Sequence, residues 1–415
     1  MRKGILLALA VLTPAILVCG EEALAHEKDK KTVTVANLNI FHGIPCAAAG
    51  DKTQCRLAER IDLLFKHLAA LGCPDIVTLQ EVLDRDNVLS LDPSSGSPVV
   101  IGNLTSALSL IKAKLSAGEG EDCGSEYPYV RYSAALPLNP RPLFEGTDGE
   151  LILSRYPIEH AEVRLLHSAL FVPLPPPNSS PFLQAFARHV LFARIIDHPV
   201  GHPIHVFTMH LAASDDLGDN PCDSLLSFPS AGLTFDVSCP AECDGAETVR
   251  QCQARQVANF VKEHLQEKDD DTLTVIAGDI NAKPHSAVYK EFTKAERKRE
   301  LRWIDSYLAA DNPECKRHTG IGCTAGRDAV GGDLENPDPN VDERIDYIFV
   351  VPSNPALRCT LQEKGTGLFA AQPNPFENEQ CGPSGPICWA SDHNGTRANL
   401  NCKHSAHHHF SPASW

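Results

Sequence analysis

The chain contains two stretches in which a helical pattern of apolar residues is followed by a short strand pattern. Over residues 54–71, leucine and isoleucine recur at helical spacing, and Gly72 supplies a stop signal before the apolar run 76–80. A second helical pattern over 254–265 leads through an acidic turn into the β-branched run 272–277. The recurrence of this unit predicts strands that are joined by helices.

Further apolar or β-branched segments predict more strands, at residues 32–40, 151–153, 189–196, 204–209 and 344–351. Some neighbouring strands are separated by a helix and others follow one another directly, which favours sheets with helices outside, an α/β layered sandwich. The stretches between them are rich in Pro, Gly, Ser or Cys, and loops of such length in a compact domain are functional or ordered by cross-links. These stretches cover 91–98, 173–181, 214–248, 311–342 and 372–387.

Composition indicates an ordinary globular protein with an acidic surface. The chain has 415 residues, of which 43% are hydrophobic and 22% charged, so it has ample apolar material for a large core. Its formal net charge of −16 repels polyanions at long range, which argues against tight, non-specific binding of nucleic acid. Divalent cations bound at a carboxylate-rich site would locally reverse this sign.

The N-terminus has the order of a secretory signal peptide. A basic start at residues 1–3 precedes an apolar run over 5–18 and then the small-residue segment 23–25. The apolar run is shorter than the about 20 residues that span a bilayer. We therefore expect residues 1–25 to be cleaved and the protein to be secreted or periplasmic. A lipoprotein signal ending at Cys19 is the alternative, which the bulky residue before it disfavours.

Cysteine usage agrees with export. Of the 15 cysteines, removal of Cys19 with the signal leaves 14, an even number suited to disulfides in an oxidising compartment. A zinc site is the rival interpretation for the four cysteines between 222 and 252, but their spacings do not repeat a paired C-x-x-C pattern, so we expect them to pair among themselves. Local pairs are predicted for Cys46 with Cys55, Cys315 with Cys323, and Cys381 with Cys388.

Polar residues stand at the ends of several predicted strands. Taken singly, such a residue is more often a turn former, a cap or a packing residue than a catalyst. Together they supply oxygen ligands for a hard cation, amide donors and imidazoles, which is a full set for metal-assisted hydrolysis. The set is Asn39, Glu81, His210, Asp279, Asn281, Asp346, Asp392 and His393.

Seven short motifs occur in order between residues 37 and 393. In this order they resemble the endonuclease/exonuclease/phosphatase superfamily, which includes pancreatic-type deoxyribonucleases, abasic-site endonucleases, bacterial sphingomyelinases and inositol-phosphate 5-phosphatases. Each motif alone is a weak signal, whereas the ordered series is specific. The motifs are Asn37-Leu38-Asn39-Ile40, Leu79-Gln80-Glu81-Val82, Leu153-Ser154-Arg155-Tyr156-Pro157-Ile158, Thr208-Met209-His210-Leu211, Gly278-Asp279-Ile280-Asn281, Arg344-Ile345-Asp346-Tyr347 and Ser391-Asp392-His393.

Three departures narrow the resemblance. Met209 is added between the threonine and histidine of the Thr-His-Leu motif. The Trp-Gly-Asp pattern of inositol-phosphate 5-phosphatases is absent because Ala277 precedes Gly278, which disfavours that activity. The extra length of the chain lies in loops that would rim the cleft, so substrate preference does not carry over from the superfamily.

The resemblance implies a metal site for Mg²⁺, with Mn²⁺ or Ca²⁺ as alternatives. Glu81 would be the direct ligand, Asn39 would lie beside it, and Asp392 would contribute a further oxygen. The number of metal ions stays open.

The resemblance also implies catalytic roles. Asp346 would orient His393 and favour its imidazolium form. Asp279 would orient or deprotonate the attacking water, while His210 and Asn281 would donate to phosphate oxygens as negative charge grows. Whether Asp279 or His393 is the base stays open.

We therefore expect an α/β fold, a four-layer sandwich of two packed mixed β-sheets flanked by helices, with disulfide-rich loop insertions. Residues 26–415 would form one endonuclease/exonuclease/phosphatase domain. Its insertions are expected around 84–125, 171–187, 212–248, 311–342 and 360–390.

The predicted function is Mg²⁺-dependent hydrolysis of phosphodiesters, with DNA or RNA as substrate, by a monomer with no obligate protein partner. Within the same superfamily, a sphingomyelinase-like phospholipase C or a phosphomonoesterase is the alternative. The apolar segments 170–172 and 225–228 are candidate loops for lipid contact, unless they pack under the disulfides. A non-catalytic binding module on the same fold would be expected to lack site residues, and all eight are present.

Overall fold

The computed structural model describes residues 32–91, 98–117, 123–134, 149–168, 170–172, 183–184, 188–214, 218–228, 233–236, 238–266, 272–294, 303–338, 341–351 and 357–404. The predicted signal peptide over 1–25, with Cys19, lies outside these ranges, as does most of the predicted insertion 171–187. No helix within these ranges is long and apolar enough to cross a membrane.

One large sheet has seven strands and carries both the first and the last strand of the described residues. Its strands β1 (Thr32–Asn39) and β2 (Ile76–Gln80) are parallel, because the helix α3 (Leu57–Ala70) returns the chain between them. The other pairings are antiparallel, so the sheet is mixed. Its order is β17 (Leu357–Leu361), β19 (Gly395–His404), β1, β2, β6 (Gly149–Ser154) and β5 (Tyr129–Ala134), with β18 (Gly367–Phe369) also paired to β19.

The second large sheet has six strands and repeats this design. Its strands β11 (Ile204–His210) and β14 (Leu273–Asp279) are parallel, and the helix α5 (Val249–Gln266) lies between them in the chain. Antiparallel pairings flank these two strands, so this sheet is mixed as well. Its order is β15 (Ile304–Asp305), β16 (Asp346–Val351), β14, β11, β10 (His189–Ile195) and β7 (Ile158–Leu165).

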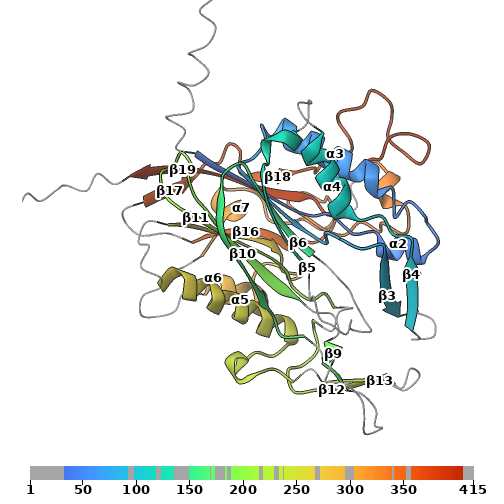
Figure 1. Cartoon of the computed structure of the whole chain (residues 1–415), viewed down its shortest axis with the longest axis horizontal. Coiled ribbons are helices and arrows are strands. Elements are labelled where there is room, and N and C mark those ends of the chain that lie inside the picture. The colour runs from blue at the N-terminus through green and yellow to red at the C-terminus, as the bar shows by residue number, and fades with distance from the viewer. Residues whose placement is uncertain are drawn as a thin grey trace, which may run out of the picture.

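Three apolar clusters hold the sheets and helices together. The helices α3 and α5 lie on opposite outer sides of the sheets (Figure 1). Successive side chains of a strand point to opposite faces of the sheet. On β1, Leu38 therefore packs in the layer beneath α3, whereas Val35 packs between the sheets. On β11, Phe207 packs beneath α5, whereas Val206 packs between the sheets. The predicted sandwich of two sheets with helices outside is confirmed.

Two shorter helices complete the outer layers. α4 (Ala107–Ser116) lies beside α3 on the first sheet, and α6 (Ala287–Thr293) lies beside α5 on the second. Each begins at a serine whose side-chain oxygen accepts the N–H three residues on, which satisfies one of the free donors at a helix start.

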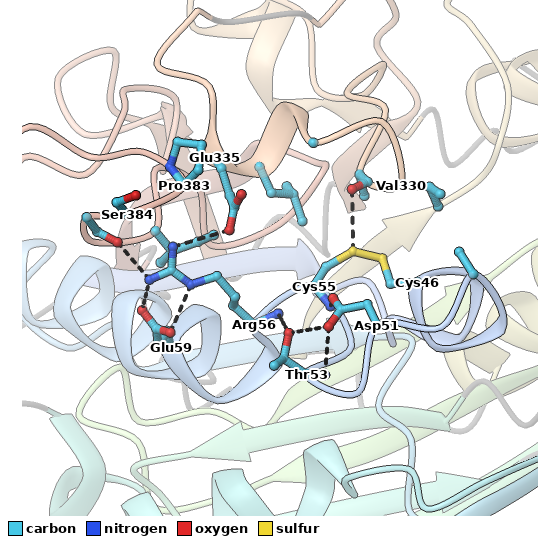
Figure 2. A pocket seen from close by; sticks show the side chains of 16 residues that line it. Cys46, Asp51, Thr53, Cys55, Arg56, Glu59, Val330, Glu335, Pro383 and Ser384 are labelled. Atoms are coloured by element: carbon cyan, nitrogen blue, oxygen red, sulfur yellow. Dashed lines mark hydrogen bonds and ion pairs between the residues drawn. A yellow bond between two sulfur atoms is a disulfide. The ribbon is translucent and has the colours of Figure 1, made fainter.

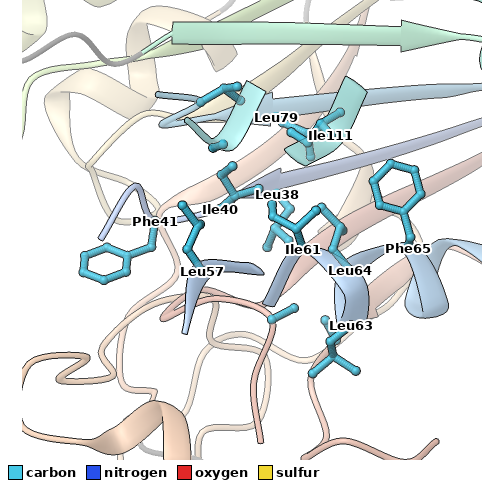
Figure 3. Packing of buried hydrophobic residues seen from close by; sticks show 14 of the residues in the cluster. Leu38, Ile40, Phe41, Leu57, Ile61, Leu63, Leu64, Phe65, Leu79 and Ile111 are labelled. Carbon is cyan, nitrogen blue, oxygen red and sulfur yellow. The ribbon is translucent and has the colours of Figure 1, made fainter. Parts of the chain in front are cut away.

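The layer beneath α3 explains the helical pattern of the sequence. Leu57, Ile61 and Leu64 lie on one face of the helix and pack with Leu38 and Ile40 at the end of β1 (Figure 3). Burying one such side chain stabilises a fold by about 1.5–3 kcal/mol. The apolar stripe thus fixes the helix against the strand that carries the first predicted site residue.

Segments between the main strands form two smaller sheets. β3 (Asn87–Leu91) and β4 (Pro98–Gly102) pair as a hairpin. The segments 170–172 and 225–228 are strands β8 (Leu170–Val172) and β12 (Leu225–Phe228), so the prediction that they are loops was wrong. Pairing satisfies main-chain N–H and C=O groups that a loop leaves to water. Both strands belong to a four-stranded sheet with β9 (Leu183–Gln184) and β13 (Leu233–Asp236).

Seven disulfides cross-link the described residues and indicate an oxidising environment, because cytosolic thiols are kept reduced. The three predicted local pairs are present, and the four cysteines between 222 and 252 pair among themselves as predicted. The bridges are Cys46–Cys55, Cys73–Cys123, Cys222–Cys239, Cys243–Cys252, Cys315–Cys323, Cys359–Cys402 and Cys381–Cys388.

A buried ion pair fixes the outer edge of the second sheet. Arg344 Nη2 lies 2.7 Å from Asp305 Oδ2, and both side chains are buried. Asp305 also caps the short helix α7 (Ser306–Ala309), since its Oδ1 accepts the N–H of Tyr307 at 3.1 Å. Loss of the carboxylate charge would leave a guanidinium buried without compensation.

We expect Asp305→Asn to lower the free energy of unfolding by about 3–5 kcal/mol, the usual cost of breaking a buried ion pair. Urea denaturation measures this change. The control is Asp342→Asn, which removes the surface partner of Arg317, a residue with 72% of its side chain exposed. Equal denaturation midpoints for the two variants would contradict the prediction.

Candidate functional site

The predicted site residues lie at strand ends of both large sheets. In the first sheet, β1 ends at Asn39 and Glu81 follows β2 directly. In the second sheet, β11 ends at His210 and β14 ends at Asp279. Asp346 begins the antiparallel strand β16 directly opposite Asp279. Since parallel strands finish at the same edge, the two sheets bring these side chains to one end of the sandwich.

The main chain turns sharply at two of these strand ends. Glu81 and Asn281 have φ angles of 58° and 50°, in the left-handed region that non-glycine residues seldom adopt. Gly278 lies against the neighbouring strand, where an added Cβ would stand 2.1 Å from the carbonyl oxygen of Met209. Only glycine therefore allows β14 to approach β11 this closely before Asp279.

The amide of Asn39 joins the two sheets. Its Nδ2 donates to Glu81 Oε1 at 2.9 Å and to Asp279 Oδ2 at 3.1 Å. Its Oδ1 accepts the N–H of Phe41 at 3.0 Å, which fixes the orientation of the amide. Asn39 thereby holds a carboxylate of each sheet beside the other.

His393 and Asp346 form a buried imidazole–carboxylate pair. His393 Nδ1 donates to Asp346 Oδ2 at 2.8 Å, and His393 Nε2 lies 4.0 Å from Asp279 Oδ2. Burial lowers the pKa of His393, but the charges of Asp346, Asp392 and Asp279 outweigh burial and hold that pKa well above its usual value. The imidazolium form is therefore favoured.

Ser391 ties this pair to the first sheet. Its Oγ donates to the carbonyl oxygen of Asn39 at 2.6 Å and accepts the N–H of His393 at 3.1 Å. The C-terminal triplet is thus anchored to the end of β1, although the two segments are far apart in the sequence.

Asp279 is buried at the centre of the site. Burial, followed by the charge of Asp346, raises the pKa of Asp279, while His210 and His393 act in the opposite direction. Its Oδ1 accepts the N–H of Asn281 at 2.8 Å. A carboxylate with a raised pKa is a stronger base than an exposed one.

His210 and Asn281 present an imidazole and an amide beside Asp279. Asn281 Nδ2 lies 2.9 Å from His210 Nε2, and His210 Nε2 lies 3.6 Å from Asp279 Oδ2. On the other side of the ring, Arg188 Nη1 lies 3.0 Å from His210 Nδ1. The guanidinium only donates and so calls for an acceptor at Nδ1, whereas the amide nitrogen of Asn281 calls for an acceptor at Nε2. A neutral imidazole has one acceptor nitrogen and can satisfy only one of these two contacts.

The sequence analysis did not identify Arg188 as a site residue. It also missed a second buried pair of a carboxyl group and an imidazole. Arg188 precedes β10, and the pairing of Val190 with Met209 sets it beside the end of β11. Glu150, the second residue of β6, contacts His189, and both side chains are buried. Burial raises the pKa of Glu150, while His189, His210 and Arg188 lower it. The sequence signal that could have identified Glu150 is its position as an acidic residue at the start of an apolar strand.

The oxygen donors suited to a hard cation lie beside Asn39. Burial and the charge of Glu81 raise the pKa of Asp392, so the two carboxylates repel each other. A divalent cation bound between them would relieve this repulsion, and carboxylate oxygen is the donor that Mg²⁺ prefers. These residues therefore fit a magnesium site, with the Asn39 amide beside it.

A second group of side chains also meets the spacing of a metal site. Ligand atoms of Asp279, Asp346 and His393 lie within 4.8 Å of one another. However, the nitrogen and oxygen of His393 and Asp346 already bond to each other, which favours a proton-handling role. The eight predicted residues thus meet in one region, with oxygen donors on one side and proton carriers on the other.

One hollow in the described part of the chain is lined by other residues than those of this site. A hollow of about 620 Å³ lies beside the Cys46–Cys55 disulfide and is lined by Asp51, Arg56 and Glu335 among others (Figure 2). None of the eight predicted site residues lines it.

A family model described as "Endonuclease/Exonuclease/phosphatase family" matches residues 36–393. No curated protein matches the chain. Three solved structures are similar over most of the chain. An endonuclease/exonuclease/phosphatase from Bacteroides vulgatus is 16% identical, with a TM-score of 0.47, and the match covers 90% of this chain and 99% of that chain.

Two TDP2 structures show similar values. TDP2 of D. rerio, complexed with a single-strand DNA product, is 18% identical with a TM-score of 0.45, and the match covers 89% of this chain and 99% of that chain. Truncated TDP2 of Caenorhabditis elegans is 16% identical with a TM-score of 0.43, covering 89% of this chain and 97% of that chain.

We expect Asp346→Asn to lower the pKa of His393, because it removes the charge that contributes most to raising it. An NMR titration of the histidine rings in metal-free protein measures this shift. The native pair stabilises the fold fully below the unfolded pKa of about 6.5, and this contribution is lost as pH rises through the folded pKa. Asp342→Asn, on the surface, is the control. If the His393 ring titrates at the same pH in both variants, Asp346 does not set its charge.

Proposed function

Because this chain belongs to the endonuclease/exonuclease/phosphatase family and is a metal-dependent phosphoester hydrolase, we propose that it is a phosphodiesterase that cleaves DNA or RNA. The observation that carries the proposal is the meeting of the two sheets at Asn39, whose amide contacts both Glu81 and Asp279. This contact sets a cation-binding carboxylate beside a buried base.

Asp279 is proposed as the group that receives a proton from the attacking water. Its burial and raised pKa support this role, and Asn281 holds one of its oxygens through a main-chain N–H. His393 is the alternative base. Its pairing with Asp346 favours the protonated ring, which has no lone pair for a proton and instead suits stabilisation of negative charge.

His210 and Asn281 are proposed to bind non-bridging phosphate oxygens. His210 Nε2 and Asn281 Nδ2 lie 2.9 Å apart beside Asp279, so a phosphate at this position would be within reach of both the imidazole and the amide. Arg188 supports this role, because its guanidinium lies 3.0 Å from His210 Nδ1 and adds a positive charge beside the ring.

Glu81 is proposed as the main Mg²⁺ ligand, with Asp392 contributing and Asn39 orienting Glu81. A bound Mg²⁺ would neutralise phosphate charge and lower the pKa of its water. Without the cation, a chain of net charge −16 has little attraction for a nucleic acid.

Export and a single-domain organisation are part of the proposal. Seven disulfides support maturation outside the cytosol, in line with cleavage of residues 1–25 and a secreted or periplasmic location. The mature residues 26–415 are proposed to act as one monomeric domain whose insertions surround the site.

We expect the purified protein to nick and degrade plasmid DNA in Mg²⁺ and to lose this activity in EDTA, because the carboxylate pair requires a cation. Agarose gels measure the cleavage of DNA and RNA substrates under both conditions. Parallel assays with sphingomyelin and a simple phosphomonoester test the alternatives. Hydrolysis of either, without cleavage of nucleic acid, would refute the nuclease proposal.

We expect Asp279→Ala and His393→Ala each to reduce kcat by about 10²–10⁴-fold, the contribution of a positioned acid or base. Both proteins should retain the wild-type circular dichroism spectrum. His285→Ala is the matched control, since 71% of the His285 side chain is exposed. Near wild-type turnover in either site variant would show that the site is misassigned.

A further inference from the structure

Arg60 is a buried cation within α3 that the proposed chemistry does not use. Its side chain has 0% exposure, although burying a charge is costly unless it is compensated. Among the ion pairs formed by the described residues, none includes Arg60. Its hydrogen-bond partners are instead neutral acceptors.

Four main-chain carbonyls surround the guanidinium. Nη1 donates to Ile40 O at 2.6 Å and Nη2 donates to Phe41 O at 3.0 Å, in the segment that follows β1. Nε donates to Cys55 O at 2.8 Å and Nη2 also donates to Gln54 O at 3.2 Å, in the turn before α3. One side chain thus joins two irregular segments that are not held by strand pairing.

The turn that supplies two of these carbonyls has an unusual conformation. Gln54, Cys55 and Arg56 have consecutive φ angles of 54°, 54° and 57°, which L-residues rarely adopt in succession. The Cys46–Cys55 disulfide closes it, and the Asp51 carboxylate accepts the N–H of Cys55 at 2.7 Å (Figure 2). The sequence therefore maintains a strained turn whose carbonyls point at Arg60.

The other two carbonyls lie directly after Asn39. Phe41 is also left-handed, with φ of 56°, and its N–H holds the Oδ1 of Asn39. The same Asn39 amide donates to Glu81. A displacement of Phe41 would release the amide oxygen and with it the orientation of Asn39. Burial lowers the pKa of Arg60, while the negative charges of Asp392 and Glu81 act on it in the opposite direction.

We propose that Arg60 is a positioning residue of the metal site, which fixes the main chain after Asn39 and thereby holds Glu81 in the orientation that receives the cation. This inference rests on the proposed assignment of Glu81 and Asp392 to Mg²⁺. Arg60 itself touches neither the cation nor the substrate.

Mg²⁺ binding to the substrate-free protein, measured by calorimetry, tests the proposal. Arg60→Lys keeps the charge, but an ammonium cannot donate to four carbonyls in this planar arrangement. We expect it to weaken Mg²⁺ binding by about 10-fold or more, the range found for residues that orient metal ligands. Raising the Mg²⁺ concentration should restore kcat, because the reacting groups are unchanged.

Arg56→Lys is the matched control. Arg56 also donates to main-chain carbonyls, but these belong to Gly382 and Gly385 and not to the segments that follow β1 or carry the site residues. Its substitution should leave Mg²⁺ affinity unchanged. Asp51→Ala is a second test variant, which loosens the turn and leaves Arg60 in place, and it should also weaken Mg²⁺ binding.

The outcomes separate this inference from the proposed function. Wild-type Mg²⁺ affinity in folded Arg60→Lys, or in Asp51→Ala where Arg60→Lys fails to fold, would overturn the role of Arg60. A wild-type protein that binds neither Mg²⁺ nor Mn²⁺ would instead overturn the metal site itself.

Discussion

The site depends on one amide that joins the two sheets. Asn39 ends β1, and its Nδ2 contacts Glu81 of its own sheet and Asp279 of the other. One nitrogen serves both carboxylates because the amide oxygen is held by Phe41. The separation of Glu81 and Asp279 is therefore set by the packing of β1 against β14, a rigid apolar interface, and not by the loops around the site.

Two buried arginines hold the irregular main chain on either side of this amide. Arg60 holds the carbonyls that follow Asn39. Arg327 donates to the carbonyl oxygens of Ser391 and Asp392 at 3.4 and 3.3 Å and stacks on a buried tryptophan ring. The guanidinium N–H groups are directed at these carbonyl oxygens, so the carboxylate oxygens of the site stay available for the proposed cation and water. At each of the two positions, a neutral side chain with fewer N–H groups would form hydrogen bonds with fewer of these carbonyl oxygens.

Much of the fold was predictable because strands buried on both faces read as apolar runs. The helix–strand units, the sandwich and the polar strand ends all follow from local pattern. β19 (Gly395–His404) was not predicted, since its sequence alternates polar and small residues and its place depends on pairing with β1. Arg188 and Glu150 were missed for a related reason. Their contacts arise from the register between strands and from packing between sheets, which no local pattern encodes.

The charges inside the site and the net charge of the chain act in opposite directions on an anionic substrate. Arg60 and Arg344 have 0% and 1% exposure, so their charges serve internal acceptors and add little to the outer field. A net charge of −16 repels a polyanion at long range, whereas Arg188, the His393 imidazolium and a bound cation would oppose this repulsion within the site. For the proposed nucleic-acid substrate, the attraction within the site would act on the phosphate being cleaved and would depend on the bound cation.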